Sequence, residues 1–236
     1  MTDAPGARGP VLEGRPVVTG SLPELYEVRF DEREVSQKDA VWREIVAYLG
    51  RFIDPDAPVL DLACDRGHFI RFVNARERWA TDIRDVSASL PPDVHFVQAP
   101  GSELAKVLPT GHFGTVFMSN YLEHLESGEA VIEQLRVAQA LIRPGGRVVI
   151  LQPNIRLVGP RYWDFIDHRV ALTERSLLEA AEIAGLGTVK LVPRFLPYST
   201  KGRLPSDSRL VRLYLAVPLM WRLMGRQTLY VGERRA

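Results

Sequence analysis

The chain has 236 residues, of which 46% are hydrophobic and 25% are charged, and its formal net charge is +1. Such a balance gives no electrostatic reason to expect nucleic acid as a partner, because phosphate binding needs a concentrated basic face. The one cysteine, Cys64, excludes an intrachain disulfide and fits a reducing cytoplasm. There is no uninterrupted apolar run of about 18 residues, so a membrane-spanning helix is not expected.

Residues 1–20 contain Gly, Pro and Arg but no apolar core, which predicts a flexible tail and not a signal peptide. Apolar side chains three or four positions apart then predict helix up to Leu49, and Gly50 ends it. We expect residues 21–236 to form a single domain.

Strand and helix patterns alternate beyond Gly50. Seven strands are predicted, at residues 58–62, 78–81, 94–98, 113–119, 146–152, 188–195 and 228–231. Helical stretches are predicted around residues 69–75, 103–107, 129–141 and 173–184. This alternation indicates an α/β fold, in which helices cover both faces of a mostly parallel sheet.

Residues 59–69 are the most informative segment, because an apolar strand runs into a tight acidic turn that contains a glycine. Strand, turn and helix start in this order are the geometry of a nucleotide-binding βα unit. Asp82 follows Asp61 at the point where the second strand should end. A carboxylate in that place can accept hydrogen bonds from both ribose hydroxyls of a nucleoside.

These two segments resemble the class I S-adenosylmethionine-dependent methyltransferases. The resemblance implies a Rossmann-like, doubly wound sheet of seven strands with the last strand antiparallel, and S-adenosyl-L-methionine as cofactor. In that family the loop has alternating glycines, whereas this chain has Ala63, Asp65 and Gly67 at those positions. Glycine permits positive φ and close approach to a ligand, whereas Asp65 adds bulk and negative charge, and the sequence leaves open whether the replacements weaken cofactor binding. Aspartate tolerates the left-handed region better than most residues, so the turn itself is expected to survive.

Two later segments support the resemblance by their order along the chain. Residues 113–125 look like the fourth strand of the family and the turn after it, which lies beside the methionine part of the donor. Residues 141–147 hold a Pro-Gly-Gly turn, which ends a helix before the fifth strand.

A wider resemblance, to small bacterial methyltransferases of unsettled substrate, covers almost the whole chain. It rests on residues 25–30, 151–156, 162–168 and 194–198 and on Trp42. We therefore expect an N-terminal helical lid over residues 21–50 and a helical insertion over residues 196–226, before the last strand.

The resemblance also implies a cofactor site. Its residues are Tyr26, Arg29, Asp61, Ala63, Asp65, Gly67, Asp82, Ile83, Ser119 and Asn120. Arg29 is expected to pair with the donor's carboxylate through its planar fork, although an ordinary surface arginine fits its acidic neighbours equally well. Asp61 and the carbonyl of Ser119 are expected to bind the donor's ammonium group.

Methyl transfer from a sulfonium is an in-line displacement, so the protein mainly holds the donor carbon and the acceptor atom about 3 Å apart in a dry site. A hydroxyl acceptor also has to lose its proton, and histidine suits that task. His124, after the fourth strand, is the first catalytic candidate, and a packing or capping role is its alternative. His168 is the second candidate.

Glu123 with His124, and Asp167 with His168, supply two carboxylates and two imidazoles. Such a set could hold a divalent metal if the two turns converge. The sequence alone does not determine that convergence, and adjacent side chains seldom point the same way. We therefore predict no metal.

Residues 205–226 are strongly apolar and carry a basic stripe. Its members are Arg209, Arg212, Arg222 and Arg226. A helical lid packed on the sheet is the favoured interpretation. A segment that lies on a membrane surface and a dimer contact stay open as alternatives.

The sequence thus predicts a cytoplasmic methyltransferase, monomeric or homodimeric, that acts on O or N of a small molecule. A sugar or nucleotide-linked sugar in glycan or natural-product biosynthesis is the suggested acceptor. Residues 119–122 lack the Asn/Asp-Pro-Pro-aromatic sequence associated with nucleobase amines. Two alternatives stay open: a cofactor-binding protein of this fold without transfer activity, motivated by Ala63 and Asp65, and a membrane-surface enzyme with a lipid-linked acceptor.

Overall fold

The computed structural model describes residues 32–198 and 208–234. The chain divides into two compact units, Met1–Ser36 and Gln37–Ala236, and the whole sheet lies in the second. The predicted tail, the first part of the predicted lid, and Tyr26 and Arg29 lie outside the described residues. The expected tail, lid and single domain therefore stay predictions.

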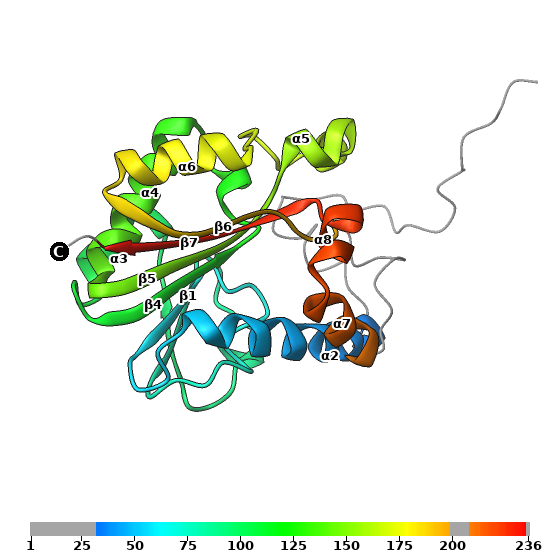
Figure 1. Cartoon of the computed structure of the whole chain (residues 1–236). Helices are drawn as coiled ribbons and strands as arrows, with labels where there is room; N and C mark the ends of the chain where they lie inside the picture. The colour runs from blue at the N-terminus through cyan, green and yellow to red at the C-terminus, as the bar shows by residue number, and fades with distance from the viewer. Residues whose placement is uncertain (1–31, 199–207, 235–236) are drawn as a thin grey trace, which may run out of the picture. The chain divides into compact units, whose positions relative to one another are not determined.

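A seven-stranded sheet in the order β3-β2-β1-β4-β5-β7-β6 forms the centre of the second unit (Figure 1). Its strands are β1 (Val59–Leu62), β2 (Arg78–Asp82), β3 (Val94–Gln98), β4 (Phe113–Ser119), β5 (Ile142–Pro153), β6 (Leu186–Leu196) and β7 (Gln227–Arg234). Strands β1 to β5 pair in parallel, and β7 runs antiparallel between β5 and β6. The predicted Rossmann-like sheet with an antiparallel last strand is confirmed.

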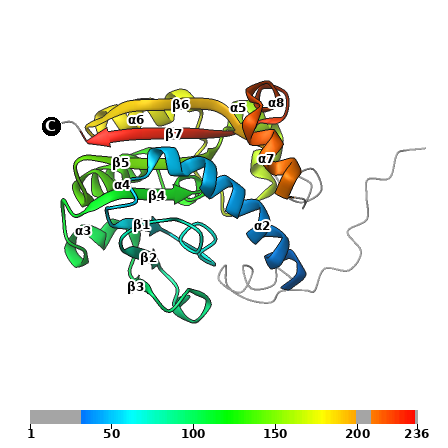
Figure 2. The same ribbon diagram turned by 60° about the horizontal axis from the view of Figure 1, so that its bottom comes forward.

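Helices cover both faces of this sheet. The α-helices are α2 (Glu32–Leu49), α3 (Leu104–Val107), α4 (Gly128–Leu141), α5 (Ile155–Val158), α6 (Glu174–Ile183), α7 (Ser208–Ala216) and α8 (Pro218–Met224). Five short 3-10 helices join them: η1 (Gly50–Phe52), η2 (Ser87–Ser89), η3 (Gly101–Glu103), η4 (Leu122–His124) and η5 (Gly159–Asp164). As Figure 2 shows, α4 and α6 lie on one side of the sheet and α2 on the other.

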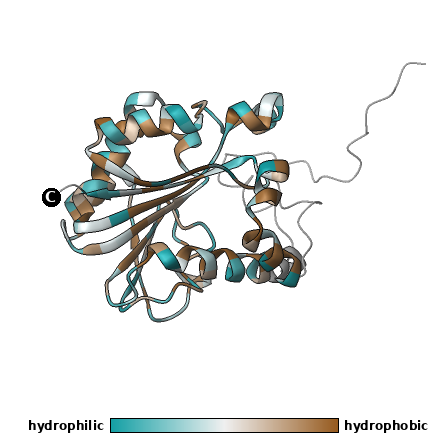
Figure 3. Cartoon of the chain, viewed as in Figure 1, coloured by the Kyte–Doolittle hydropathy of each residue, from teal (hydrophilic) through white to brown (hydrophobic). Residues whose placement is uncertain are grey.

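Strand β5 shows why the central strands are apolar throughout. Val148 and Ile150 pack into the core that contains α4 and α6, whereas Val149 and Leu151 pack into the core that contains α2 and α7. Successive side chains of a strand point to opposite faces, and both faces are buried here. Figure 3 shows brown, hydrophobic stretches on the central strands, interrupted by white and teal segments.

The helix expected over residues 69–75 is wrong. Two helical hydrogen bonds form, from Arg71 N to Gly67 O and from Val73 N to Phe69 O, but the segment continues as turns. The reason is Arg78 on β2. Its guanidinium donates to the carbonyl oxygens of Ile70 and Arg71 at 3.1 and 3.2 Å, which a helix would use for its own next turn.

The connection between β6 and β7 carries α7 and α8, as the expected helical insertion requires. Val211, Tyr214 and Leu215 of α7 are buried against the sheet. Arg212 donates two hydrogen bonds to Glu44 of α2, at 2.8 and 2.9 Å. In the described ranges, which leave out 199–207 and both ends, no helix has the length and apolar character to cross a bilayer.

Candidate functional site

The loop after β1 keeps the backbone of a glycine-rich turn although two of its glycines are replaced. The φ angles are 56° at Ala63, 48° at Asp65 and 70° at Gly67. These are the three positions where the resemblance places glycine. At Ala63 the Cβ costs roughly 1–2 kcal/mol in this left-handed region, whereas aspartate tolerates it better, so the surrounding fold imposes the turn against the local preference of Ala63 in particular.

Gly67 shows what the turn demands at its third position. A Cβ there would lie 2.3 Å from the side chain of Leu90. Cys64, inside the same loop, is buried, and desolvation raises the pKa of its thiol. It is therefore a packing residue without the thiolate character that redox chemistry needs.

Asp61 sits beneath the loop and is almost completely buried. Burial raises the pKa of its carboxyl well above the ordinary value, the N–H of Ile70 opposes this by donating at 3.3 Å, and the negative charges of Asp82 and Asp65 raise the pKa further. A cationic group placed beside Asp61 would lower this pKa and favour the ionised form.

Asp82 ends β2 at the same edge of the sheet, and Arg84 surrounds its carboxylate. One oxygen accepts from the backbone N–H and the Nε of Arg84 at 3.0 and 3.1 Å. The other accepts from the N–H of Asp65 at 3.0 Å and from Arg84 Nη2 at 3.4 Å. A carboxylate has about four acceptor positions, and all four of Asp82 are used.

Arg84 also donates to the side chain of Asp65 at 2.8 Å. One guanidinium therefore pairs with both the carboxylate at the end of β2 and the carboxylate that Asp65 adds to the loop. Ile83, which stands between Asp82 and Arg84 in the sequence, is 68% exposed. An exposed aliphatic side chain beside a buried carboxylate suits a ligand with a flat aromatic ring and a hydroxylated arm, as a nucleoside has.

At the end of β4 the chain leaves the sheet through Ser119 and Asn120. Asn120 has φ of 48°, its N–H still donates to Leu151 O of β5 at 2.9 Å, and its side-chain amide donates to Ser119 Oγ at 3.1 Å. This positive φ turns the chain into η4, so that the next functional residues lie at the same carboxyl edge as Asp82.

The turns that carry His124 and His168 converge. The N–H groups of Arg169 and Val170 both donate to Glu123 O, at 2.8 and 3.0 Å. The ring centroids of His124 and His168 are 5.0 Å apart. The structure thus brings together the two predicted catalytic histidines, which lie far apart in the sequence.

The hydrogen bond of His124 defines its tautomer. Its Nδ1 lies 3.0 Å from Asp167 O, and a carbonyl oxygen can only accept. Nδ1 therefore carries a proton, and in the neutral ring the lone pair is on Nε2. That atom lies 3.9 Å from Glu123 Oε1.

Glu123 is the most deeply buried carboxylate at this edge, with 0% exposure. Burial raises the pKa of its carboxyl, and His124 opposes the shift. Gln152 lies beside it, yet neither Glu123 oxygen has hydrogen-bond geometry with any described group. The buried hydroxyl of Tyr198 likewise has no partner among the described residues.

The sequence did not single out Arg84, Gln152 or Tyr198 as site residues. Arg84 could have been predicted, because a loop with an additional aspartate needs a nearby cation and Arg84 is close to it in the sequence. Gln152 and Tyr198 had none, since their place depends on how β5 and the segment after β6 pack around η4.

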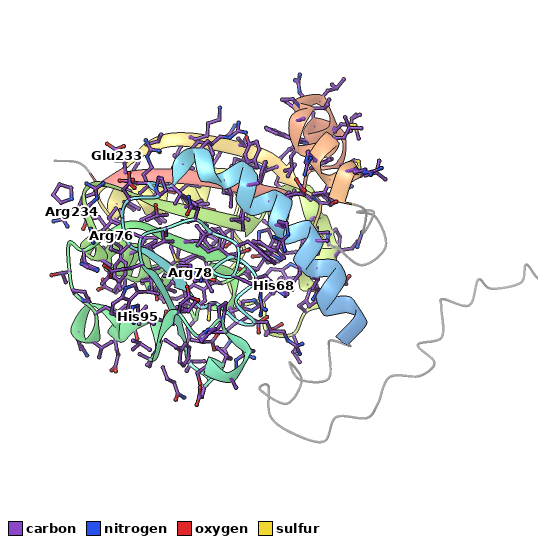
Figure 4. The ribbon with its side chains drawn as sticks, turned by 90° about the horizontal axis from the view of Figure 1, so that it is seen from below. His68, Arg76, Arg78, His95, Glu233 and Arg234 are labelled. Carbon is purple, nitrogen blue, oxygen red and sulfur yellow. The ribbon has the colours of Figure 1, made fainter. Side chains whose placement is uncertain are left out.

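His68 and His95 make contacts of another kind. His68 contacts Asp39 at 2.8 Å and stacks on Trp42 of α2, and His95 packs on Trp79 at the far edge of the sheet (Figure 4). Their contacts are those of structural residues.

Residues 35–191, more than half of the chain, match the family model described as a methyltransferase domain. No curated protein matches the chain. Among solved structures, an S-adenosylmethionine-dependent methyltransferase from Archaeoglobus fulgidus is 19% identical, with a TM-score of 0.61 over 91% of this chain and 100% of that one.

Two further solved structures of similar fold are named for different reactions. The geranyl diphosphate C-methyltransferase of Streptomyces coelicolor A3(2), solved with Mg²⁺, geranyl diphosphate and S-adenosyl-L-homocysteine, is 14% identical, with a TM-score of 0.56 over 80% of this chain and 78% of that one. The [4+2]-cyclase SpnF is 15% identical, with a TM-score of 0.58 over 82% and 81%. At these identities the likeness concerns the fold.

Proposed function

The chain belongs to the methyltransferase domain family, and on that premise we propose that it methylates an oxygen or nitrogen atom of a small molecule. It is an enzyme whose methyl donor is S-adenosyl-L-methionine. The observation that supports the proposal most is the glycine-type backbone at Ala63, Asp65 and Gly67. Such a backbone is maintained against the preference of Ala63 in particular, which a loop without a ligand would not require.

Each predicted donor residue has a role that suits its place. The Asp82 carboxylate accepts the ribose hydroxyls, and the exposed Ile83 packs on the adenine ring. Asp61 and the carbonyl of Ser119 receive the donor's ammonium group, whose positive charge would offset the burial of the Asp61 carboxyl. Asn120 lies beside the methionine part, and the backbone at 63–67 follows the donor. Tyr26 and Arg29, outside the described residues, are proposed from the sequence alone.

Donor binding requires Arg84 to move. All four acceptor positions of Asp82 are used, and three of them by Arg84. The ribose hydroxyls must displace the Nε and Nη2 groups of that side chain. Arg84 remains bonded to Asp65 when it does so, which keeps its charge satisfied.

The acceptor side is formed by the converged turns. The bound donor supplies an electrophilic methyl group, and the protein has to position the acceptor atom and help it lose a proton. His124 and His168 are proposed as the catalytic residues, because the Nε2 lone pair of His124 is directed by the bond from Nδ1 to Asp167 O.

A polyhydroxylated acceptor, such as a sugar or a nucleotide-linked sugar, fits the groups gathered there. They are a carboxylate, an amide and a phenol that are buried and rich in unused hydrogen-bonding capacity: Glu123, Gln152 and Tyr198. A site built to bond hydroxyls discriminates strongly against acceptors that lack them. A place in natural-product or glycan assembly, and a cytoplasmic location, are proposed from the sequence.

A methyl-transfer assay with a panel of acceptors tests the proposal. Sugars, nucleotide sugars, phenols and amines are incubated with the full chain and isotopically labelled donor, and products are detected by mass spectrometry. We expect transfer to at least one hydroxylated acceptor. Donor binding with transfer only to apolar or protein acceptors would contradict the proposed acceptor class.

The His124→Ala variant tests the acceptor side. We expect the rate of the chemical step to fall about a hundredfold or more, because proton transfer by a positioned side chain contributes that much. Donor affinity should be retained, since His124 does not contact the donor loop. His95→Ala is the matched control and should leave the rate unchanged. Near-normal turnover of His124→Ala would place the base elsewhere.

The lipid-linked alternative is less well supported. Two members of its basic stripe have partners within the protein: Arg212 binds Glu44, and Arg226 donates to Leu157 O. Leu219 and Leu223 of α8 are exposed, so an apolar surface is present, but the stripe does not present four free charges to a membrane.

A further inference from the structure

We propose that Glu123, His124 and His168 bind a divalent transition-metal ion. One ligand atom of each residue lies within 4.8 Å of the ligand atoms of the other two. Ligand atoms held at about 2.1 Å by a tetrahedral ion lie about 3.4 Å apart. Side-chain movements that bring each pair up to about 1.4 Å closer would therefore complete the site.

The carboxylate of Glu123 has room for a cation. It is completely buried, and neither of its oxygens has hydrogen-bond geometry with a described residue, although His124 Nε2 lies 3.9 Å away. A buried carboxylate whose acceptor positions are not filled is unfavourable. Its backbone is held in place by the N–H groups of Arg169 and Val170. A cation between Glu123 and the two imidazoles would satisfy it without any change of backbone.

His124 is oriented as a metal ligand. Its Nδ1–H donates to Asp167 O, so its Nε2 lone pair faces the side where Glu123 Oε1 lies at 3.9 Å. Metal-binding histidines usually donate their other ring N–H to a backbone carbonyl or carboxylate, which fixes the tautomer. The Asp167 carboxylate, 3.6 Å from the same Nδ1, reinforces this orientation.

The ligand set indicates which ion is bound. Two imidazoles and one carboxylate suit Zn²⁺, Co²⁺ or Mn²⁺ better than Mg²⁺ or Ca²⁺, which prefer oxygen ligands alone. Three protein ligands also leave a coordination position for an outside oxygen.

The role of the ion rests on the proposed function. An acceptor hydroxyl in the open position would have a lowered pKa and release its proton to solvent. Its oxygen would then form the bond to the methyl carbon as the carbon–sulfur bond of the donor breaks and the electron pair stays on sulfur. With the ion bound, the Nε2 lone pair of His124 is a ligand and does not take the proton, so the ion replaces the base role proposed for His124.

Calorimetric titration of chelator-treated full chain with ZnCl₂ and CoCl₂, without donor or acceptor, tests the proposal. We expect one site with micromolar or tighter affinity, and a visible absorption band for Co²⁺. Glu123→Gln, His124→Ala and His168→Ala should each weaken binding at least about tenfold, as loss of a ligand does. His95→Ala, far from the cluster, is the control.

A thermal melt keeps the test interpretable if a variant is altered in stability. Glu123→Gln keeps the side-chain volume and removes the buried charge, so the metal-free variant should melt at or above the wild-type temperature. The stabilisation that Zn²⁺ gives the wild type should be lost. The absence of Zn²⁺ and Co²⁺ binding, or binding unaffected by all three substitutions, would overturn the proposal. Donor titration is measured separately, so failure of the metal site is distinguishable from failure of methyl transfer.

Discussion

Ala63 and Asp65 hold a backbone that favours glycine, and their side chains alter the site in different ways. Ala63 adds only a methyl group, whereas Asp65 adds a charge that Arg84 shares with Asp82. The loop has therefore kept its shape and changed its electrostatics. A weaker cofactor site would follow from the charge and from Arg84, and not from loss of the turn.

Ala63→Gly tests the strain in the loop. An ordinary Ala→Gly change in a helix costs about 0.5–1 kcal/mol. At Ala63 the relief of the left-handed conformation offsets that cost, so the free energy of unfolding should be unchanged or higher. Urea denaturation measures it, with Ala140→Gly in α4 as the control that should show the ordinary loss. An equal loss in both variants would mean that the loop is unstrained.

Arg84→Ala tests whether Arg84 competes with the donor. Removing the side chain frees the acceptor positions on Asp82 that Arg84 Nε and Nη2 occupy. S-adenosyl-L-methionine should therefore bind about fivefold more tightly, the equivalent of one hydrogen bond. Removing a positive charge favours a sulfonium donor in the same direction. Calorimetry measures the affinity, and Arg76→Ala is the control on an exposed arginine. Weaker binding would instead make Arg84 a donor contact.

At the scale of elements, the pair of α2 and α7 is held by Glu44 and Arg212. The hydrogen bond from Arg212 lowers the pKa of Glu44 below its ordinary value, against the effect of burial. A depressed carboxyl pKa contributes stability above the unfolded pKa, and that stability is lost as the pH falls through the folded pKa.

Arg212→Gln should therefore be less stable than the wild type at pH 7, and the difference should shrink below about pH 4.5, where Glu44 becomes protonated. Thermal melts across this pH range, with Arg209→Gln as the control on the same helix, measure the difference. A constant difference down to pH 3 would show that Arg212 acts through packing alone.

Prediction from the sequence succeeded where a pattern is local and failed where a tertiary contact decides. The strands followed from continuous apolar runs, and Val94–Gln98 and Phe113–Ser119 have the predicted bounds. The helix at 69–75 failed because Arg78, on the next strand, takes its carbonyl groups. The start of β5 at Ile142 was missed because a Pro-Gly-Gly turn does not indicate a strand that passes through it.

At the scale of the whole molecule, the candidate site is a product of topology. The residues proposed to bind the donor come from the ends of β1, β2 and β4, which meet at one edge because these strands are parallel. Asp61 and Asp82 could thus be placed together from the sequence. The meeting of η4 with residues 167–170 could not, because it depends on backbone hydrogen bonds to Glu123 across a long connection.

The central claim is that the Asp82 carboxylate accepts hydrogen bonds from the ribose hydroxyls of S-adenosyl-L-methionine. Calorimetric titration of the wild type and of Asp82→Ala with this donor tests it most directly. We predict micromolar binding by the wild type and a loss of roughly 1–3 kcal/mol in the variant, since its hydrogen bonds to the hydroxyls disappear. Equal affinity of the two proteins, or no binding by either, would contradict the account.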